Sequence, residues 1–155
     1  MTPAIELLKK NNIAHRVHEY VHARSASSYG EEAAQKLNIA PARVFKTLVV
    51  ASDDRLAVCV VPVVGQLDLK KAAKALQVKR CDMAEAKRVE RSSGYVLGGV
   101  SPLGQKKLLP TLIDSSATGF DTIFVSAGKR GLEIELSPQD LAALTGAEFV
   151  MIGKG

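Results

Sequence analysis

The chain has 155 residues, 46% hydrophobic and 24% charged, a balance typical of one globular domain with a single sizeable core. It has no Trp and only 5% aromatic residues, which argues against a binder of single-stranded nucleic acid built on stacked aromatic side chains. The formal net charge of +5 permits an anionic partner such as RNA, but it is also ordinary for a soluble protein.

Targeting and metal signals are absent from the sequence. The first ten residues have no cationic start and no long apolar segment, and no apolar run reaches the length of a membrane span. Cys59 and Cys81 follow no metal or redox spacing and fit a reducing compartment. We therefore expect a cytoplasmic protein of one domain, residues 1–155, with a monomer favoured and with no cofactor, metal site or membrane contact.

Helix and strand signals alternate irregularly in the first third of the chain. Thr2 and Pro3 are expected to begin a helix that stops at Asn11. A strand is predicted over residues 14–21, and a Ser-rich loop then leads to a helix over residues 31–37.

The two strongest strand predictions come next. Residues 44–51 and 56–64 are rich in β-branched side chains, and Asp53 and Asp54 between them predict a hairpin. Both strands are apolar on both faces, so other layers should cover each side of their sheet.

A lysine-bearing amphipathic helix is predicted over residues 69–76. Its apolar positions recur at helical spacing, and Lys70, Lys71 and Lys74 lie on its other face. Such a stripe is usually a solvated face, and direct binding of phosphates is the alternative interpretation.

The rest of the chain continues the mixed pattern. A helix capped by Ser137 and closed by Gly146 is the clearest element there. The order favours an α+β fold, with a mixed sheet or barrel flanked by helices, over a regular doubly wound sheet. The other expected elements are a short helix opened by Asp82 and Glu85 and ending near Arg91, and strands over residues 108–114, 120–126, 132–136 and 148–152.

Lys46 is the most informative single residue. Strand alternation puts its side chain on the same face as Val44, Leu48 and Val50. An amine among aliphatic neighbours loses hydration, and this loss must be offset. Two interpretations stay open: a functional lysine, or a side chain that reaches the rim of the sheet.

Recognisable catalytic constellations are few. His15, His18 and His22 cluster in sequence, but strand alternation turns His15 away from the other two, so a three-ligand metal site is not expected. No nucleophile elbow, Walker loop or zinc-type cysteine pairing occurs in the sequence. The sequence therefore offers no ready nucleophile–base pair.

Two glycine-rich segments remain. Glycines in residues 94–104 could bring backbone N–H groups close to a ligand and hold an oxyanion, although a bulged strand with a tight turn is the simpler interpretation. Residues 125–131 join two predicted strands, as expected of a hairpin turn with solvated charges.

Several segments in order along nearly the whole chain resemble the YbaK/EbsC family. Each is weak alone, but their ordered combination is specific. They are Met1–Ala4, Phe45-Lys46-Thr47-Leu48, Gly65–Lys71, Gly98–Lys107 and Ser126–Gly131.

This resemblance implies a single-domain enzyme that edits mischarged tRNA in trans, on the fold shared with prolyl-tRNA-synthetase-associated domains. The implied substrate is cysteine esterified to proline tRNA, and prolyl-tRNA synthetase is the implied partner in a ternary complex. The substrate's own thiol would attack its ester carbonyl and leave as a cyclic thiolactone, so the protein would need only to orient the ester and stabilise the oxyanion.

The family's site residues carry over by position. Lys46 would position the ester and the tRNA end, and Gly98, with Gly99 beside it, would hold the substrate carbonyl. Relatives often have Phe at position 29 and Gly at position 127, so the pocket shape stays open. The remaining substrate-binding candidates are Tyr20, Tyr29, Thr47 and Ser126.

Two other functions are compatible with the sequence. One is a deacylase that uses an activated water to clear alanine or another small residue from tRNA. The other is a non-catalytic module that binds tRNA or a synthetase through the lysine stripe.

Overall fold

The structure, a computed structural model, describes residues 1–23 and 29–155, so residues 24–28 of the predicted Ser-rich loop lie outside it. The helices are α1 (Pro3–Lys10), α2 (Tyr29–Lys36), α3 (Leu69–Leu76), α4 (Ala86–Ser93) and α5 (Pro138–Thr145), with short 3-10 helices at Pro41–Arg43 and Ser115–Gly119. The strands are β1 (Arg16–Glu19), β2 (Phe45–Ser52), β3 (Arg55–Pro62), β4 (Gln66–Leu67), β5 (Asp82–Met83), β6 (Thr111–Asp114), β7 (Ile123–Lys129), β8 (Leu132–Leu136), β9 (Glu148–Val150) and β10 (Gly153–Lys154).

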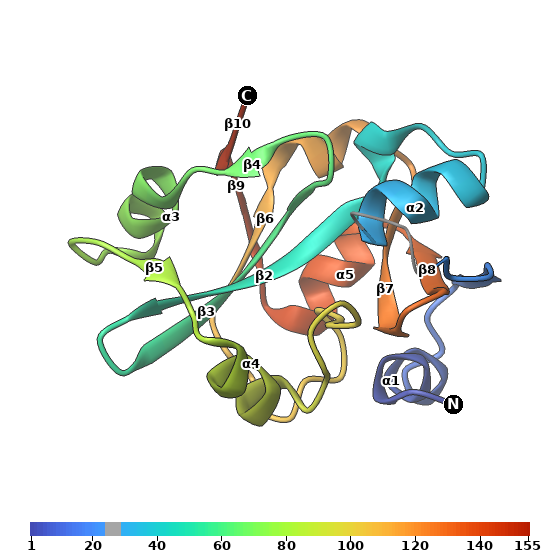
Figure 1. Cartoon of the computed structure of the whole chain (residues 1–155), viewed down its shortest axis with the longest axis horizontal. Helices are drawn as coiled ribbons and strands as arrows, with labels where there is room; N and C mark the ends of the chain where they lie inside the picture. Colours follow the sequence, from blue (N-terminus) through green and yellow to red (C-terminus); the bar gives the residue numbers. More distant parts are fainter. Residues whose placement is uncertain (24–28) are drawn as a thin grey trace.

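A five-stranded mixed sheet forms the larger part of the fold, in the order β5-β2-β3-β6-β9 (Figure 1). β2 and β3 form the predicted hairpin, paired from Phe45–Pro62 to Ser52–Arg55, and Asp53 makes the turn with a positive φ of 56°. β6 and β9 add parallel to β3, whereas β5 adds antiparallel to β2. These pairings confirm the α+β class and the mixed sheet; within the described residues the sheet stays open at β5 and β9.

Helices cover this sheet on both faces, as the doubly apolar strands predict. Val49 and Val58 are buried in a cluster that includes side chains of α1, α4 and α5. Val50 and Cys59 point the other way and pack with Ala72 and Ala73 of α3. None of the described helices is long and apolar enough to cross a membrane.

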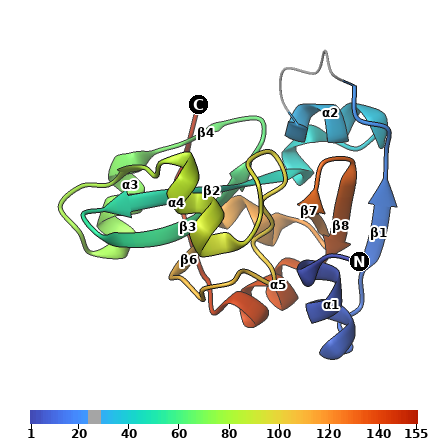
Figure 2. The same ribbon diagram turned by 60° about the horizontal axis from the view of Figure 1, so that its bottom comes forward.

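A second, antiparallel sheet in the order β1-β8-β7 lies beside the beginning of β2, and both views show this junction (Figure 1, Figure 2). A parallel bridge joins Val44, just before β2, to Phe124 in β7. Ala33 and Ala34 of α2 pack on these two residues, so α2 closes the junction from outside. The two sheets and α2 thereby meet around the first residues of β2.

Helix ends follow the predicted capping. Thr2 Oγ1 accepts the Ile5 N–H at 3.3 Å, and Ser137 Oγ accepts the Asp140 N–H at 3.1 Å. The predicted helix start at Asp82 is wrong, because Asp82 pairs with Ala51 as part of β5 and α4 begins only after Glu85.

Residues 94–104 do not form the bulged strand. They make a loop in which Gly94, Gly98 and Gly104 have positive φ.

Candidate functional site

A cavity of about 310 Å³ lies at the junction of the two sheets. Along residues 45–48, β2 pairs with β3 on one side only, since β5 reaches no further than Val50. The cavity therefore follows an open strand edge, so that four successive residues of β2 reach it. Its lining consists of Tyr20, Gly30, Phe45, Lys46, Thr47, Leu48, Val63, Leu97, Gly98, Val100, Ser126, Lys129, Arg130 and Glu133.

β2 contributes an amine and a hydroxyl. Lys46 is half-buried, and its Nζ donates a hydrogen bond to the Gly65 carbonyl oxygen at 3.0 Å. Thr47 Oγ1 is buried and has no hydrogen-bond partner among the described residues. A buried polar atom without a partner is uncommon, and here it adjoins a cavity in which a ligand could supply one.

Of the two glycines predicted to bind substrate in residues 94–104, Gly98 lines the cavity and Gly99 does not. Gly98 lines the cavity with a φ of +90°, and in the described part of the chain its N–H has no backbone acceptor. Gly99 is not among the lining residues. Its N–H donates to the Val96 carbonyl at 3.0 Å, and a Cβ there would lie 3.1 Å from Lys129 Cα. Gly99 thus packs the loop against the β7–β8 turn, and of the two glycines only Gly98 lines the cavity.

The β7–β8 hairpin provides the opposite wall. Ser126 Oγ accepts the Gly128 N–H at 3.1 Å, so its own O–H remains available to a ligand. Glu133 lies directly across from Ser126 in the antiparallel register and is buried. Burial raises the pKa of Glu133 to about 8. Burial, followed by the nearby charge of Glu133, raises the pKa of Tyr20 to about 12.

The structure therefore gathers five of the seven predicted residues around one cavity: Tyr20, Lys46, Thr47, Gly98 and Ser126. Tyr29 begins α2 beside the lining residue Gly30, but its side chain lies outside the described part of the structure. The sequence interpretation missed Glu133, together with the exposed cations Lys129 and Arg130 at the cavity. A glutamate alternating with aliphatic residues in a strand reads as solvent-facing, so no sequence signal marked Glu133.

The three histidines serve other contacts. His15 Nδ1 lies 2.7 Å from the Ile13 carbonyl oxygen, His18 Nε2 lies 2.9 Å from Glu135, and His22 Nδ1 lies 2.6 Å from Glu32. Among the described residues, no group of three or more possible metal ligands occurs.

The chemistry of the cavity is that of a binding and polarising site. Its described lining contains no histidine or cysteine, and no hydrogen bond joins Ser126 to Glu133 there. It does contain two amines, a guanidinium, a glycine amide and three hydroxyls around one buried acid. Such groups can hold a carbonyl and the oxygen of an ester without attacking it.

Comparisons with known proteins identify relatives of this chain and agree with its fold. A family model described as aminoacyl-tRNA editing domain matches residues 23–144. The chain is 38% identical over 152 residues to "Putative Cys-tRNA(Pro)/Cys-tRNA(Cys) deacylase EbsC" of Enterococcus faecalis, covering 97% of this chain and 92% of that protein. It is 27% identical to "Uncharacterized protein YwhH" of Bacillus subtilis, covering 82% of this chain and 81% of that one.

A solved structure shows the same fold. It is described as "Crystal structure of a putative trans-editing enzyme for prolyl tRNA synthetase", and it superposes with a TM-score of 0.88 at 24% identity. The match covers 99% of this chain and 96% of the other.

Proposed function

This chain belongs to the YbaK/EbsC family of aminoacyl-tRNA editing domains, and on that premise we propose that it removes cysteine wrongly esterified to proline tRNA. The observation that carries the proposal is the cavity, which gathers Lys46, Gly98 and Thr47 around a described lining without a nucleophile–base pair. A reaction in which the substrate supplies its own nucleophile needs no such pair. The protein would act in trans in the cytoplasm, as a single domain.

In the proposed reaction, the cysteine thiol gives up its proton as Sγ attacks its own ester carbonyl carbon. The bond from that carbon to the ribose oxygen of the tRNA breaks, the ribose oxygen takes a proton, and a cyclic thiolactone leaves. Holding thiol and carbonyl in contact can supply on the order of 7 kcal/mol in favourable intramolecular cases. Alanine and proline have no thiol, so selectivity for cysteine follows from the chemistry.

Each polar group of the cavity would have its own role in this reaction. The Gly98 N–H, with no backbone acceptor in the described structure, would donate to the developing oxyanion. Lys46 Nζ would leave the Gly65 carbonyl and hold the ester or the adjoining phosphate. The hydroxyls of Thr47 and Ser126 would bind the remaining polar atoms of the terminal nucleotide.

Glu133 would meet the α-amino group of the substrate. An aminoacyl ester carries a cationic amine next to its carbonyl, and Glu133 is the one acid among the described lining residues. A cation beside this buried carboxyl favours its ionised form, so substrate and glutamate would stabilise each other's charge. An N-blocked aminoacyl ester would lack that contact.

The first test is deacylation of labelled Cys-tRNA(Pro) by the wild type, Lys46→Ala and Lys10→Ala. Lys10 is an exposed lysine in the last turn of α1, so it serves as the matched control. We expect hydrolysis by the wild type and by Lys10→Ala, with a loss of about 100-fold or more in Lys46→Ala, the range measured when one polarising donor is removed. A wild type that binds tRNA but leaves the ester intact would make the chain a binding module instead.

A second test addresses the source of the nucleophile. S-methylcysteine on the same tRNA has no free thiol and should survive, whereas Cys-tRNA(Pro) is cleared. Rapid loss of the methylated ester, or of Ala-tRNA(Pro), would point to an activated water and to the broader deacylase.

Specificity for one tRNA is proposed to come from a complex with prolyl-tRNA synthetase. The solved structure with this fold, over 99% of this chain, is described as a putative trans-editing enzyme for prolyl tRNA synthetase, which supports such a partnership. Cross-linking of the two proteins in the presence of proline tRNA should give a ternary species. Its absence at concentrations that support deacylation would refute the partnership.

A further inference from the structure

The excess positive charge of this chain is concentrated in the segment that follows Val63, a residue of the cavity lining. The chain has 21 Lys and Arg against 16 Asp and Glu. Residues 65–81 and position 154 together hold six of the basic side chains and one acid, Asp68, which leaves 15 of each sign in the rest of the chain. The net charge of +5 therefore belongs to one region rather than to the surface as a whole.

Four lysines of this region lie on α3 and β10, and we call them the basic surface: Lys70, Lys71, Lys74 and Lys154. All four are exposed. The first three lie on one face of α3, while Ala72 and Ala73 on the opposite face are buried against the sheet.

Contacts within the region bring α3 and β10 together. Lys71 Nζ donates to the Gly153 carbonyl at 3.5 Å, which places it beside Lys154. Hydrogen bonds from the Lys71 and Lys70 N–H groups, with the charges of Lys154 and Lys71, lower the pKa of Asp68. The four lysines thus form one surface across two elements that are 83 residues apart in sequence at Lys71 and Lys154.

The basic surface is continuous with the cavity. Lys46 Nζ bonds to the Gly65 carbonyl, and Gly65 directly precedes β4, which pairs with β10. A Cβ on Gly65 would lie 3.0 Å from the Lys154 carbonyl oxygen, so the two backbones touch. α3, β4 and β10 lie along one edge of the molecule (Figure 1).

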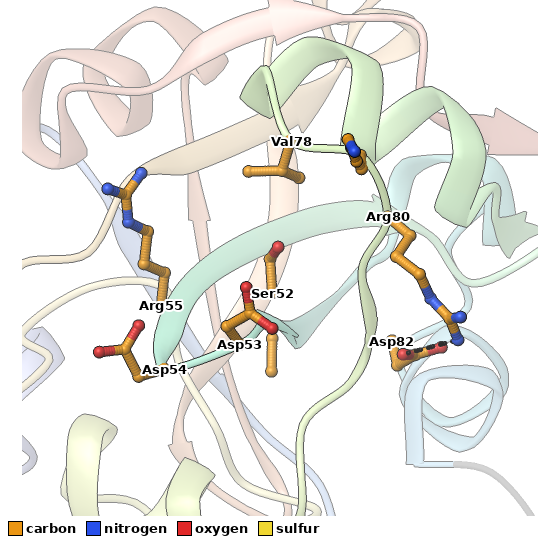
Figure 3. A pocket seen from close by; sticks show the side chains of 9 residues that line it. Ser52, Asp53, Asp54, Arg55, Val78, Arg80 and Asp82 are labelled. Carbon is orange, nitrogen blue, oxygen red and sulfur yellow. Dashed lines mark hydrogen bonds and ion pairs between the residues drawn. The ribbon is translucent and has the colours of Figure 1, made fainter.

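At the far end of the region, around Lys79 and Arg80, positive and negative charges balance. A larger, open hollow of about 740 Å³ lies there, at the tip of the β2–β3 hairpin (Figure 3). Arg80 is paired with Asp82 at 3.3 Å, and Asp53 and Asp54 stand on the hairpin turn. The carboxylates of Asp53, Asp54 and Asp82 offset the three cations of this hollow, so the basic surface extends from α3 toward the cavity and not beyond it. The three cations are Arg55, Lys79 and Arg80.

We propose that the basic surface binds the backbone phosphates of the tRNA acceptor stem and directs its 3′ end past Gly65 into the cavity. The inference rests on the proposed function, because it takes the ester-bearing RNA as the occupant. Lysines are point charges that match a row of phosphates without reading sequence. Backbone contacts of this kind suffice when the reacting group sits at the end of the RNA.

The test compares double variants that remove equal charge. Lys71→Gln/Lys154→Gln and Lys70→Gln/Lys74→Gln alter the basic surface, and Lys9→Gln/Lys10→Gln on α1 is the matched control. No side-chain hydrogen bond or ion pair of Lys70 or Lys74 is found among the described residues, so their loss should not disturb folding. Binding of uncharged proline tRNA is measured by fluorescence anisotropy from 50 to 200 mM salt, and deacylation of Cys-tRNA(Pro) is followed in parallel.

If each lysine neutralises one phosphate, each surface variant should lower the salt slope by about 2. The wild type would then lose about tenfold more affinity than the variant between 50 and 200 mM salt. KM should rise with kcat unchanged, and the control should follow the wild type.

Two results would overturn the proposal: salt slopes equal to the wild type in both surface variants, or an equal change in the α1 control. Failure of the proposed function looks different, because Cys-tRNA(Pro) would then stay intact while the salt slopes still differed.

Discussion

Replacing Glu133 by Gln should change how the stability of the protein depends on pH. Burial raises the pKa of this carboxyl from 4.5 to about 8, so the folded state holds its proton where the unfolded chain releases it. The stability contributed by neutral Glu133 is therefore fully present below pH 4.5 and is lost as the pH rises toward 8. Gln is neutral at every pH and close in shape, so it removes this dependence.

The size of the effect follows from linkage. Between pH 4.5 and about 8, each pH unit lowers the free energy of unfolding of the wild type by about 1.4 kcal/mol relative to a protein with a neutral side chain at position 133. The loss is about 2.7 kcal/mol between pH 5 and pH 7. For a chain of this size, that corresponds to about 5–10 °C in Tm. We expect thermal unfolding at pH 5, 6 and 7 to give nearly equal Tm values for the wild type and Glu133→Gln at pH 5. At pH 7, Glu133→Gln should have the higher Tm.

Glu148→Gln provides the control, since Glu148 is an exposed glutamate in another strand. Its pH profile should run parallel to that of the wild type. A Glu133→Gln profile that is also parallel would mean that Glu133 ionises freely in the folded protein. The cavity would then lack the buried acid on which the proposed contact with the α-amino group depends.

Three further substitutions test local features. Gly128→Ala should lower the free energy of unfolding by about 3 kcal/mol, because φ is +104° and the new Cβ would lie 2.5 Å from Tyr95 Cε1. Gly146→Ala, where φ is +68° and the Cβ would meet open space, should lower it by only about 1 kcal/mol. Thermal unfolding of the two variants measures this difference, and equal losses would contradict the prediction. Thr47→Val should leave stability unchanged or higher but raise KM for the aminoacyl-tRNA about 2–10-fold, since it removes a buried hydroxyl without a partner in the described structure. Asp114→Ala should cost about 3 kcal/mol in urea unfolding, because the Asp114 carboxylate accepts two backbone N–H groups next to β10 at 3.0 and 2.9 Å; a loss below 1 kcal/mol would refute its anchoring role.

Local chemistry explains why most elements were predictable from the sequence. The caps of α1 and α5 and the turn at Asp53 depend on residues within a few positions of each other. β5 depends instead on a pairing with Val50, more than 30 residues earlier, and the sequence around Asp82 resembles a helix start equally well. Only tertiary contact decides between these alternatives.

The site divides in the same way. Lys46 could be proposed from the sequence because a lysine is unusual in an apolar strand, and Gly98 and Ser126 because their glycine-rich segments resemble a known family. Glu133 could not be proposed, because its strand alternates polar and apolar residues as a half-exposed strand does. Its burial comes from the packing of the β1–β8–β7 sheet against the beginning of β2. Gly99 is the opposite case: its place in a motif suggested contact with substrate, and the structure adds a packing reason for it, because its small size lets the loop touch Lys129.

The two interpretations of Lys46 prove compatible with each other. The Lys46 side chain extends past its aliphatic neighbours and donates to the Gly65 carbonyl, as expected of a lysine that reaches the rim of the sheet. Gly65 directly precedes β4, which pairs with β10 of the basic surface. A neutral carbonyl holds an amine less firmly than a carboxylate does, so an entering phosphate or ester can take over the hydrogen bond. A lysine fixed by a buried salt bridge could not be released at comparable cost. Because its present acceptor is a neutral carbonyl, Lys46 can exchange this hydrogen bond for one to the proposed RNA substrate.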